Sequence, residues 1–339
     1  MTGMRCPALE DLPPPPAGKT GWPWTEAVPA MPQMMDAGRA WPLISIVTPS
    51  YNQGSYLEET IRSVLLQGYP NLEYVVIDGG SSDASREIIQ KYQCWLSFWV
   101  SEPDQGQSCA INKGLRRVTG DVFNWINSDD LLLPQSLQLV AEAHCQNPEF
   151  LVAGDVLFQY DVSETQERVS QTDLNFKRLV EFWNNSTSSF SPQGIFIPMA
   201  LMNKVGSLDE GLHYAFDYDL FCRLTLIARA VYLRKPLAIY RYHPASKSVA
   251  QFHRFLPEIC SVSRRFWAKV PNLDLPVSDP KGAGLLFRVG CWQILHRDLE
   301  GIGLVKDALN SDPLRAIVSA LRYFPQWLWR RWSRTTPNC

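Results

Sequence analysis

Residues 43–150 change repeatedly between two hydrophobic periods, which predicts strands that are each followed by a helix. Short apolar, β-branched runs predict strands at 43–48, 72–77, 96–101 and 122–127. After the first run, Leu57, Ile61 and Leu65 recur at the spacing of one helical face. Strands that alternate with helices predict a parallel sheet with right-handed crossovers.

The predicted helix starts carry capping residues. Ser55 and Glu58 have the spacing of a capping box at the start of the first helix. Ser82 or Asp83 is expected to cap the second helix, which runs to about Tyr92. Further helices are predicted at 110–117, after Pro134 and from 217 to about 228.

Residues 1–42 form a proline-rich N-terminal arm with neither helical nor strand periodicity. Four consecutive prolines at 13–16 favour an extended chain. Trp22, Trp24 and Trp41 offer large apolar areas, which disordered tails seldom carry. We therefore expect the second half of the arm to pack against the domain that follows it.

The pattern becomes irregular after residue 150 and predicts a mixed half with a strand at 194–197. We divide the chain into the arm, a domain of residues 43–250 and a helical C-terminal extension of residues 251–339. Within the extension, 314–334 mixes apolar residues with arginines and ends in three tryptophans. This helix either lies in the headgroup layer of an anionic membrane or docks on the domain.

Composition narrows the function classes. A hydrophobic content of 45% over 339 residues is enough for a sizeable core. The formal net charge of -2 argues against a chain-wide cationic surface, so we expect no nucleic-acid partner. The 8 cysteines include no CxxC pair, and neither a signal peptide nor an apolar run of about 20 residues is found. We predict a cytoplasmic protein, with peripheral contact to the cytoplasmic membrane face as the alternative.

Polar side chains follow three successive predicted strands. They are Asp78 after the second strand, Glu102 and Asp104 after the third, and Asn127, Asp129 and Asp130 after the fourth. The carboxyl ends of parallel strands meet at one edge, where open α/β sheets bind ligands. Gathered acids repel one another, and a bound cation is the simplest reason to bring them together. Each aspartate alone also has a structural alternative as a turn or cap residue.

Two nucleotide-binding motifs are absent from the chain. It contains neither GxGxxG nor GxxxxGK[ST], so a dinucleotide oxidoreductase and a P-loop NTPase are not supported. Residues 79–83 read GGSSD and miss the final glycine of a GxSxG elbow, which disfavours a hydrolase.

Seven segments resemble, in this order and spacing, the family 2 glycosyltransferases of the GT-A fold. They are TPSYNQGSYLEETIRSVLLQ, VVIDGGSSD, SEPDQGQSCAINKG, WINSDD, SPQGIFIP, VGSLDEGLHYAFDYDLFCRL and YRYHPASKS, within residues 43–248. The resemblance implies an α/β fold with a Rossmann-like, mostly parallel sheet flanked by helices and a mixed acceptor-side half. It also implies inverting transfer of a sugar from a nucleotide-sugar donor, with a UDP-sugar as the expected donor. The implied acceptor is a saccharide or a lipid-linked saccharide, as in cell-surface polysaccharide or glycolipid assembly.

The resemblance assigns a set of donor-binding residues. They are Thr48, Pro49, Tyr51, Asp78, Asp104, Lys113, Asn127 and Ser128. A carboxylate such as Asp78 accepts a hydrogen bond from a uracil imide, and Tyr51 offers a stacking face. Many family members carry an arginine where Ile111 stands and a second acid where Gly79 stands. Lys113 either supplies the missing charge or faces solvent.

The family's Asp-x-Asp metal motif falls on Asn127, Ser128 and Asp129, so its first carboxylate is missing. Asp129 remains as a ligand for Mn²⁺ or Mg²⁺, ions that often take only one or two protein carboxylates. His243 resembles the family's distal histidine, which contacts the metal or the diphosphate, and its alternative is a structural role. Asp130 either joins this site or caps the next turn.

The catalytic base implied by the resemblance is Asp217, at an acidic helix start. Asp219 is expected only to complement the helix N-terminus. Gln193, Arg241 and Lys247 fall on the acceptor and diphosphate side. Two alternatives stay open: a nucleotide-sugar-binding protein without catalysis, and a sugar-phosphate nucleotidyltransferase, whose glycine- and arginine-rich loop is replaced here by TPSYNQG.

Overall fold

Four short runs of apolar and β-branched residues form the centre of the fold, where they pair in parallel. The computed structural model describes residues 4–160, 166–169, 174–180, 190–244, 246–247, 252–267, 286, 290, 300–311 and 313. The chain divides into one unit of Met1–Asn175 with Ser189–Ala250 and another of Phe176–Ser188 with Gln251–Cys339. The predicted helix at 314–334 lies outside the described residues.

The first unit contains a sheet in the order β3-β2-β1-β4-β8-β6-β9-β5, with β7 paired to β6. Its strands are β1 Ile44–Ser50, β2 Leu72–Asp78, β3 Phe98–Ser101, β4 Val122–Trp125, β5 Leu131–Leu132, β6 Leu151–Tyr160, β7 Gln166–Val169, β8 Ile195–Pro198 and β9 Ala230–Tyr242. The neighbours from β3 to β4 all run parallel, whereas β8 is antiparallel to both β4 and β6. The predicted α/β fold, parallel in its first half and mixed in its second, is confirmed.

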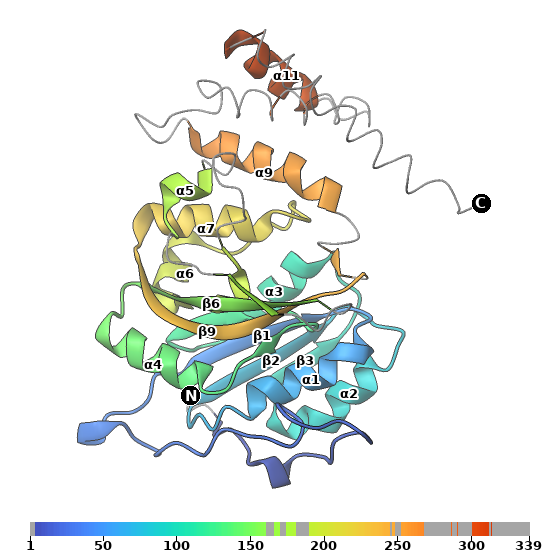
Figure 1. Cartoon of the computed structure of the whole chain (residues 1–339), viewed down its shortest axis with the longest axis vertical. Helices are drawn as coiled ribbons and strands as arrows, with labels where there is room; N and C mark the ends of the chain where they lie inside the picture. The colour runs from blue at the N-terminus through green and yellow to red at the C-terminus, as the bar shows by residue number, and fades with distance from the viewer. Residues whose placement is uncertain are drawn as a thin grey trace. The chain divides into compact units, whose positions relative to one another are not determined.

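Helices cover both faces of this sheet. They are α1 Gly54–Leu65, α2 Ser85–Tyr92, α3 Gln107–Leu115, α4 Ser136–Gln146, α6 Met199–Val205 and α7 Phe216–Ile227, with short 3-10 turns at Leu9–Asp11, Asp36–Gly38, Gln93–Trp95 and Pro192–Gly194. Helices α1 and α2 lie on one face, and α3 lies on the other (Figure 1). A Cβ atom on Gly114 of α3 would lie 2.5 Å from Val47 of β1, so this glycine lets the helix approach the strand.

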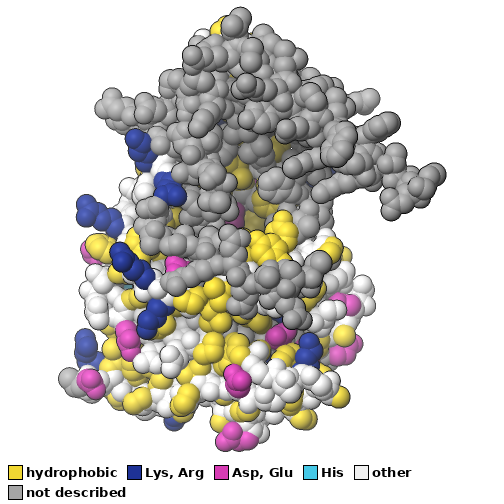
Figure 2. Space-filling view, in the orientation of Figure 1, with side chains coloured by type: hydrophobic (Ala, Val, Ile, Leu, Met, Phe, Trp, Pro, Cys, Tyr) yellow, Lys and Arg dark blue, Asp and Glu magenta, His cyan; other side chains and the backbone are white. Residues whose placement is uncertain are grey.

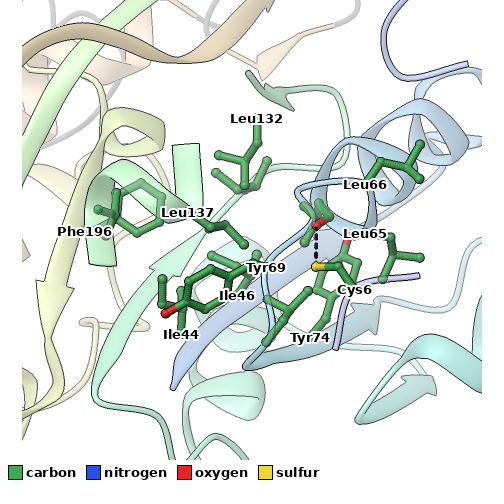
Figure 3. Packing of buried hydrophobic residues seen from close by; sticks show 14 of the residues in the cluster. Cys6, Ile44, Ile46, Leu65, Leu66, Tyr69, Tyr74, Leu132, Leu137 and Phe196 are labelled. Carbon is green, nitrogen blue, oxygen red and sulfur yellow. Dashed lines mark hydrogen bonds between the residues drawn. The ribbon is translucent and has the colours of Figure 1, made fainter. Parts of the chain in front are cut away.

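The core between the sheet and helices α1 and α4 is continuous (Figure 3). It joins Ile46 of β1, Leu65 of α1 and Leu137 of α4 to Phe196 of β8, and none of these side chains is exposed. Cys6 of the arm enters the same cluster, where its Sγ lies 4.0 Å from a backbone carbonyl oxygen of α1. Burial raises the pKa of the Cys6 thiol to about 12, so the thiol stays protonated at neutral pH.

The start of α1 differs from the prediction. The capping box at Ser55 and Glu58 is wrong, because the helix begins at Gly54 and has no cap from its own side chains. Asp83 instead accepts the Gly54 N–H at 2.8 Å, and its other oxygen accepts the N–H two residues on at 3.0 Å. Glu58 accepts the Tyr92 hydroxyl at 2.8 Å. One aspartate therefore joins the starts of α1 and α2.

Three other boundaries also shift. Strand β3 starts at Phe98, two residues later than predicted, because a 3-10 turn at Gln93–Trp95 precedes it. Strand β4 ends at Trp125, which leaves Asn127 in the following turn. Helix α3 begins at Gln107, three residues before the predicted start.

The N-terminal arm packs at both of its ends. Trp24 and Trp41 are only 5% and 9% exposed, which confirms the predicted packing of the second half. The first half packs as well, although the sequence did not predict it. Met4 exchanges two backbone hydrogen bonds with Leu72, at 2.7 and 2.8 Å, and so lies antiparallel to the start of β2.

Arg62 of α1 fastens the arm to the domain. Its side chain is fully buried. The guanidinium donates to the carbonyl oxygens of Pro13 at 2.9 Å, Pro23 at 3.0 Å and Trp24 at 3.0 Å. It also donates to the Tyr92 hydroxyl at 3.1 Å. These acceptors offset the cost of burying a cation, so the arm belongs to the folded domain.

The second unit is helical where it is described. It contains α5 Phe176–Val180, α9 Phe252–Trp267 and α11 Glu300–Ser311. Phe176 and Phe266 meet edge to face with 5.8 Å between ring centroids, and Arg264 pairs with Asp307 at 2.8 Å. No helix in the described part of the chain combines the length and apolarity needed to span a bilayer. Figure 2 shows acidic and basic side chains interspersed on the face in view.

Candidate active site

The carboxyl ends of β1, β2 and β3 meet in register. Ser50 pairs with Asp78, and Asp78 pairs with Ser101, so three polar residues end three neighbouring strands side by side. On the other side of β1, strand β4 is paired as far as Trp125 opposite Val47 and then leads into the turn at 127–130. The pairing therefore gathers the polar strand ends at one edge, as the sequence predicted.

Asp78 is fully buried, and its own turn surrounds the carboxylate. Oδ2 accepts the N–H groups of Gly80 at 3.2 Å and Ser81 at 2.9 Å, and the Ser101 hydroxyl at 2.7 Å. Oδ1 accepts the Ser81 hydroxyl at 2.5 Å. These contacts make Asp78 the anchor of the turn after β2 and leave acceptor capacity on Oδ1. Its role toward a nucleoside stays a prediction.

The other predicted nucleoside residues are exposed to very different degrees. Thr48 is fully buried, and its hydroxyl lies 3.0 Å from the hydroxyl of Tyr74 inside the domain. Pro49 is buried in the same strand. Tyr51 is 63% exposed, so its ring is open to a stacking partner. Only the tyrosine among these side chains presents a large surface at the strand end.

Asp104 lies in the turn after β3, facing Gly79. Its Oδ1 accepts the Gly106 N–H at 2.8 Å, and burial raises the pKa of the carboxyl above its ordinary value. A Cβ atom on Gly79 would lie 3.0 Å from Asp104 Oδ2, so the glycine makes room for this carboxylate. Lys113 lies 3.0 Å from Glu102 Oε1 and is partly exposed, which leaves its predicted diphosphate contact untested.

Hydrogen bonds tie the turn after β4 to three distant elements. Asp130 Oδ2 accepts Asn127 Nδ2 at 2.9 Å and Gln193 Nε2 at 2.7 Å. Asp130 Oδ1 accepts the backbone N–H of Arg241 at 3.1 Å. Asn127 Oδ1 in turn accepts Gln107 Nε2 at 2.7 Å. The network brings together the predicted residues Asn127, Gln193 and Arg241 around the buried carboxyl.

This network has unusual electrostatics. Burial, together with the neighbouring Asp129 carboxylate, raises the pKa of Asp130 to about 8. Gln193 Oε1 and His243 Nδ1 are buried and have no hydrogen-bond partner among the described residues. Ser128 is also buried, at 4% exposure. Because buried polar atoms are normally paired, the two unpaired atoms point to a place where a ligand or water binds.

Asp129 and His243 form a pair beside this network. Asp129 Oδ2 lies 3.1 Å from His243 Nε2, and 17% of the Asp129 side chain is exposed. The imidazole stacks on the Tyr56 ring of α1, with 4.4 Å between ring centroids. Asp129 thus reaches the surface while its histidine partner is held in place from behind.

The Asp129 and His243 pair fits a divalent ion. In the described part of the chain, no three His, Cys, Asp or Glu side chains group to hold a metal. Mg²⁺ and similar ions nevertheless bind through one or two protein ligands when phosphate and water supply the rest. Neighbouring ligands of an octahedral ion lie about 3 Å apart at metal–ligand distances of about 2.1 Å. The two atoms lie 3.1 Å apart at hydrogen-bond distance, so an ion held by both would replace this hydrogen bond.

Arg241 is 5% exposed and binds protein groups on several sides. Its Nη1 lies 2.8 Å from Glu59 Oε2, and its Nε donates to the backbone oxygen of Asp129. Its Nη2 donates to the Thr60 hydroxyl at 3.2 Å and to the Tyr56 carbonyl oxygen at 3.4 Å. The structure therefore places the predicted phosphate contact inside a cluster formed with α1.

The two acids at the start of α7 have different surroundings. Asp219 is buried and pairs with Arg223 at 2.8 Å, one helical turn further on. Arg223 also donates to the carbonyl oxygens of Val205 at 2.7 Å and Ser207 at 3.0 Å, which docks this helix on α6. Asp217 is partly exposed, and its Oδ1 accepts the following backbone N–H at 2.7 Å.

Lys247 connects the turn before α7 with the strand end at β9. Its Nζ donates to the carbonyl oxygen of His213 and lies 4.9 Å and 5.8 Å from the ring centroids of Tyr214 and Phe216. Lys247 is the fourth residue after His243, a span of at most about 14 Å. Lys247 thus links the chain after β9 to the segment before α7 and to the first residue of α7.

The sequence reasoning missed three residues of α1 that contact this site. Tyr56, Glu59 and Thr60 are spaced by three and four positions, which places them on one helical face. Thr60 donates its hydroxyl to the carbonyl oxygens of Ser128 at 2.8 Å and Asp130 at 2.7 Å. Helical spacing could have put these residues on a common face, but only the tertiary contacts show what that face meets.

Comparison with known proteins relates this sheet, with its polar strand ends, to glycosyltransferases. Residues 45–206 match the model described as Glycosyl transferase family 2. An uncharacterized glycosyltransferase of Rickettsia typhi is 28% identical over 60% of this chain and 65% of its own. Bacillus subtilis TuaG, a putative teichuronic acid biosynthesis glycosyltransferase, is 35% identical over 31% of this chain and 44% of its own. The chain is similar to glycosyl transferase family 2, and it spans less than two thirds of the length of these relatives.

Solved structures show the same fold at low sequence identity. S. aureus TarS aligns with a TM-score of 0.55 and 17% identity over 83% of this chain and 55% of that chain. TarS 1–349 in complex with UDP-GlcNAc gives 0.53 and 16%, over 78% and 90%. The mannosyltransferase PcManGT from Pyrobaculum calidifontis, in complex with GDP-Man and Mn²⁺, gives 0.51 and 16%, over 84% and 87%. The predicted GT-A type of fold is confirmed.

Proposed function

We propose that the protein transfers a sugar from a UDP-sugar to a hydroxyl of a cell-surface saccharide, with inversion at the anomeric carbon. The observation that carries this proposal is the pairing of Asp129 with His243 at the strand edge of a family 2 fold. The nucleotide is suggested by TarS, which was solved with UDP and with UDP-GlcNAc. The polysaccharide acceptor is suggested by TuaG, which is described as a putative teichuronic acid biosynthesis glycosyltransferase.

A divalent ion, Mn²⁺ or Mg²⁺, completes the site through Asp129 and His243. When bound, it supplies positive charge to the leaving diphosphate. Asn127 replaces the first acid of the motif and offers an amide, which hydrogen-bonds a ribose hydroxyl without adding negative charge. Fewer acids also reduce the repulsion of an anionic donor. The neutral residue therefore lowers the affinity for the ion more than the affinity for the nucleoside.

The nucleoside is proposed to bind over the ends of β1 and β2. The exposed Tyr51 ring stacks on the base, and Asp78 Oδ1 has capacity for one further N–H donor. A uracil imide presents one such N–H. Asp104 and Lys113 line the neighbouring side of this region, where the lysine contributes positive charge toward the phosphates.

Asp217 is proposed as the general base. It takes the proton of the acceptor hydroxyl while the oxygen forms a bond to the anomeric carbon. The bond from that carbon to the diphosphate oxygen breaks at the same time, and UDP leaves with the electron pair. Asp219 is unsuited to this role because Arg223 already holds its carboxylate.

The acceptor is proposed to enter beside Gln193 and Lys247. Gln193 has a buried amide oxygen without a partner among the described residues, and Lys247 lies near the start of α7. A lipid-linked saccharide would suit a chain whose residues 314–334 contact the membrane surface. The predicted cytoplasmic location, with or without that contact, is part of the same proposal.

A thermal-shift screen of UDP-, GDP- and dTDP-sugars, each with Mn²⁺ or with EDTA, tests the donor assignment. A ligand at 100 times its dissociation constant should stabilise the fold by about 2.7 kcal/mol. We expect the largest shift with a UDP-sugar in Mn²⁺. An equal shift in EDTA, or a preference for GDP-sugars, would overturn this donor and metal assignment.

A second candidate function is a sensor that binds nucleotide sugars without turnover. Asn127 favours it, since the turn after β4 lacks one of the family's carboxylates. Incubation of a UDP-sugar with the protein and Mn²⁺ separates the two functions. Release of UDP identifies an enzyme, whereas saturable binding without release identifies a sensor.

A further inference from the structure

Arg241 lies beside the proposed metal pair, yet it directs its charge into the protein. We propose that Arg241, clamped by Glu59 of α1, is a positioning residue for Asp129 and not a phosphate ligand. The inference rests on the proposed function, because it concerns how Asp129 is presented to a divalent ion. It assigns a role to a helix face that the sequence motifs left without one.

The guanidinium makes contacts that match its planar fork. Nη1 lies 2.8 Å from Glu59 Oε2, and Nη2 is 3.2 Å from the Thr60 hydroxyl. The Nε atom donates to the backbone oxygen of Asp129. Only 6% of the Arg241 side chain is exposed, so little of it can reach a diphosphate without breaking these bonds. An ammonium group cannot reproduce this arrangement, because it lacks the fork.

The same helix face also supports the histidine. The Tyr56 ring lies 5.0 Å from the Arg241 guanidinium carbon and 4.4 Å from the His243 ring centroid. Tyr56 therefore packs against both groups that contact Asp129, one through its backbone and the other through its carboxylate. The α1 helix fixes the position and the direction of the metal-binding side chain together.

Asp130, the residue after Asp129, is also held by Arg241. The backbone N–H of Arg241 donates to Asp130 Oδ1 at 3.1 Å, while its side chain binds the backbone of Asp129. Hydrogen bonds from Arg241 therefore hold both Asp129 and Asp130 against strand β9. If the Arg241 side chain moved to bind phosphate, the Asp129 backbone oxygen would lose its hydrogen bond from Arg241 Nε while Asp129 was binding the ion.

Glu59 distinguishes the two roles by the sign of its effect. Glu59→Gln removes the charge that holds Arg241 and adds no new group near the ion. A phosphate-binding Arg241 would be freed by this change, and UDP would bind more tightly. A positioning Arg241 would be loosened, and the UDP complex would bind Mn²⁺ about 10–100-fold more weakly, as is usual when a partner of a metal ligand is lost.

The experiment is isothermal titration calorimetry on the full chain. UDP is titrated in EDTA, and Mn²⁺ is then titrated into the UDP complex, for the wild type, Glu59→Gln and Arg241→Lys. Glu87→Gln, an exposed acid on α2, is the matched control for loss of a carboxylate. We expect unchanged UDP affinity in EDTA and weaker Mn²⁺ binding for both site variants, with the control like the wild type.

Asp129→Ala, titrated in parallel, separates this inference from the proposed function. If Asp129→Ala weakens Mn²⁺ binding while Glu59→Gln and Arg241→Lys leave it unchanged, the positioning role of Arg241 is wrong and the metal site stands. If Asp129→Ala has no effect, the metal site itself is wrong. Tighter UDP binding by Glu59→Gln in EDTA, or weaker UDP binding by Arg241→Lys in EDTA, identifies a phosphate ligand and overturns the inference.

Discussion

Two turns flank β1 at the same edge of the sheet, and each buries one aspartate in a different way. After β2, Asp78 is bonded mainly by its own turn, through Ser81 and its neighbours, with Ser101 from the adjacent strand. After β4, Asp130 is bonded by Asn127 of its own turn and also by Gln193 and Arg241, which lie 63 and 111 residues further along the chain. The turn after β2 is held mainly by its own groups, whereas the turn after β4 also depends on groups from distant parts of the chain.

The two turns also differ in the buried polar atoms near them that lack hydrogen-bond partners among the described residues. The turn after β4 has two adjacent acids, a raised pKa at Asp130, and buried atoms of Gln193 and His243 without partners among the described residues. Between the two turns, the Ser50 hydroxyl at the end of β1 is also buried without a described partner. The turn after β4 therefore lies beside more buried polar atoms for a ligand to satisfy than the turn after β2 does.

The sharpest test of this contrast is Asp129→Ala, which should reduce metal-dependent turnover by roughly 10³-fold or more. The change removes the carboxylate that we propose brings the ion to the leaving diphosphate. Initial rates of UDP release at saturating Mn²⁺ measure the effect, with Asp36→Ala as an exposed control. A fully active Asp129→Ala variant would sink the assignment of the turn after β4.

The second prediction concerns the base on α7. Asp217→Asn should lower turnover by roughly 10²–10⁴-fold and leave UDP binding unchanged, because it removes the proposed proton acceptor and preserves the shape of the side chain. Asp219→Asn should instead weaken the docking through Arg223 and lower the melting temperature. If Asp219→Asn reduces turnover more than Asp217→Asn does, the two assignments must be exchanged.

The sequence predicted the turn after β2 better than the turn after β4. Gly79 and Ser81 are close neighbours of Asp78, so the pattern indicated both the strand end and the turn. Motif matching placed Asp129 and His243 in one site and Arg241 on its acceptor and diphosphate side, but it gave no protein partner for Arg241. The ion pair with Glu59 depends on how α1 packs against β9, and sequence spacing carries no information about that contact.

The arm shows the same limit of sequence reasoning. Tryptophans predicted that its second half packs, whereas the contact of Met4 with Leu72 uses backbone groups that leave no side-chain pattern. The buried guanidinium of Arg62 reads in sequence as a polar position on an amphipathic helix. A charged side chain is predicted to be exposed, and that prediction fails where buried partners satisfy the charge, as they do for Arg62.

The third prediction uses the titration of Asp130. Its folded pKa of about 8 lies above the ordinary value of 3.8, so between these values the folded state holds a proton that the unfolded state has lost. Stability from this group is therefore present at low pH and falls as pH rises toward 8. Relative to Asp130→Asn, the wild type should lose roughly 2 kcal/mol between about pH 5.5 and pH 7.

Urea denaturation of both proteins at several pH values measures this difference. A parallel pH dependence of the wild type and Asp130→Asn would mean that Asp130 is ionised in the folded protein. The contrast between the two turns would then rest on hydrogen bonding alone.

The smallest expected effect is at the turn after β2. Ser81→Ala removes a hydroxyl that donates to Asp78 and accepts the Asn52 N–H at 2.8 Å, and it should cost about 1 kcal/mol of stability. Ser82→Ala is the matched control, since the Ser82 hydroxyl makes only a 3.3 Å contact with Asn52. Equal losses from both variants would show that the Asp78 turn does not depend on its local donors.

The central claim is that this protein is a metal-dependent glycosyltransferase whose ion is held at the turn after β4. The most direct measurement is UDP release from a UDP-sugar by the wild type and by Asp129→Ala, each in Mn²⁺ and in EDTA. We predict release by the wild type in Mn²⁺ only, with none above background from the variant. Equal release in EDTA, or release by Asp129→Ala at the wild-type rate, would contradict the claim.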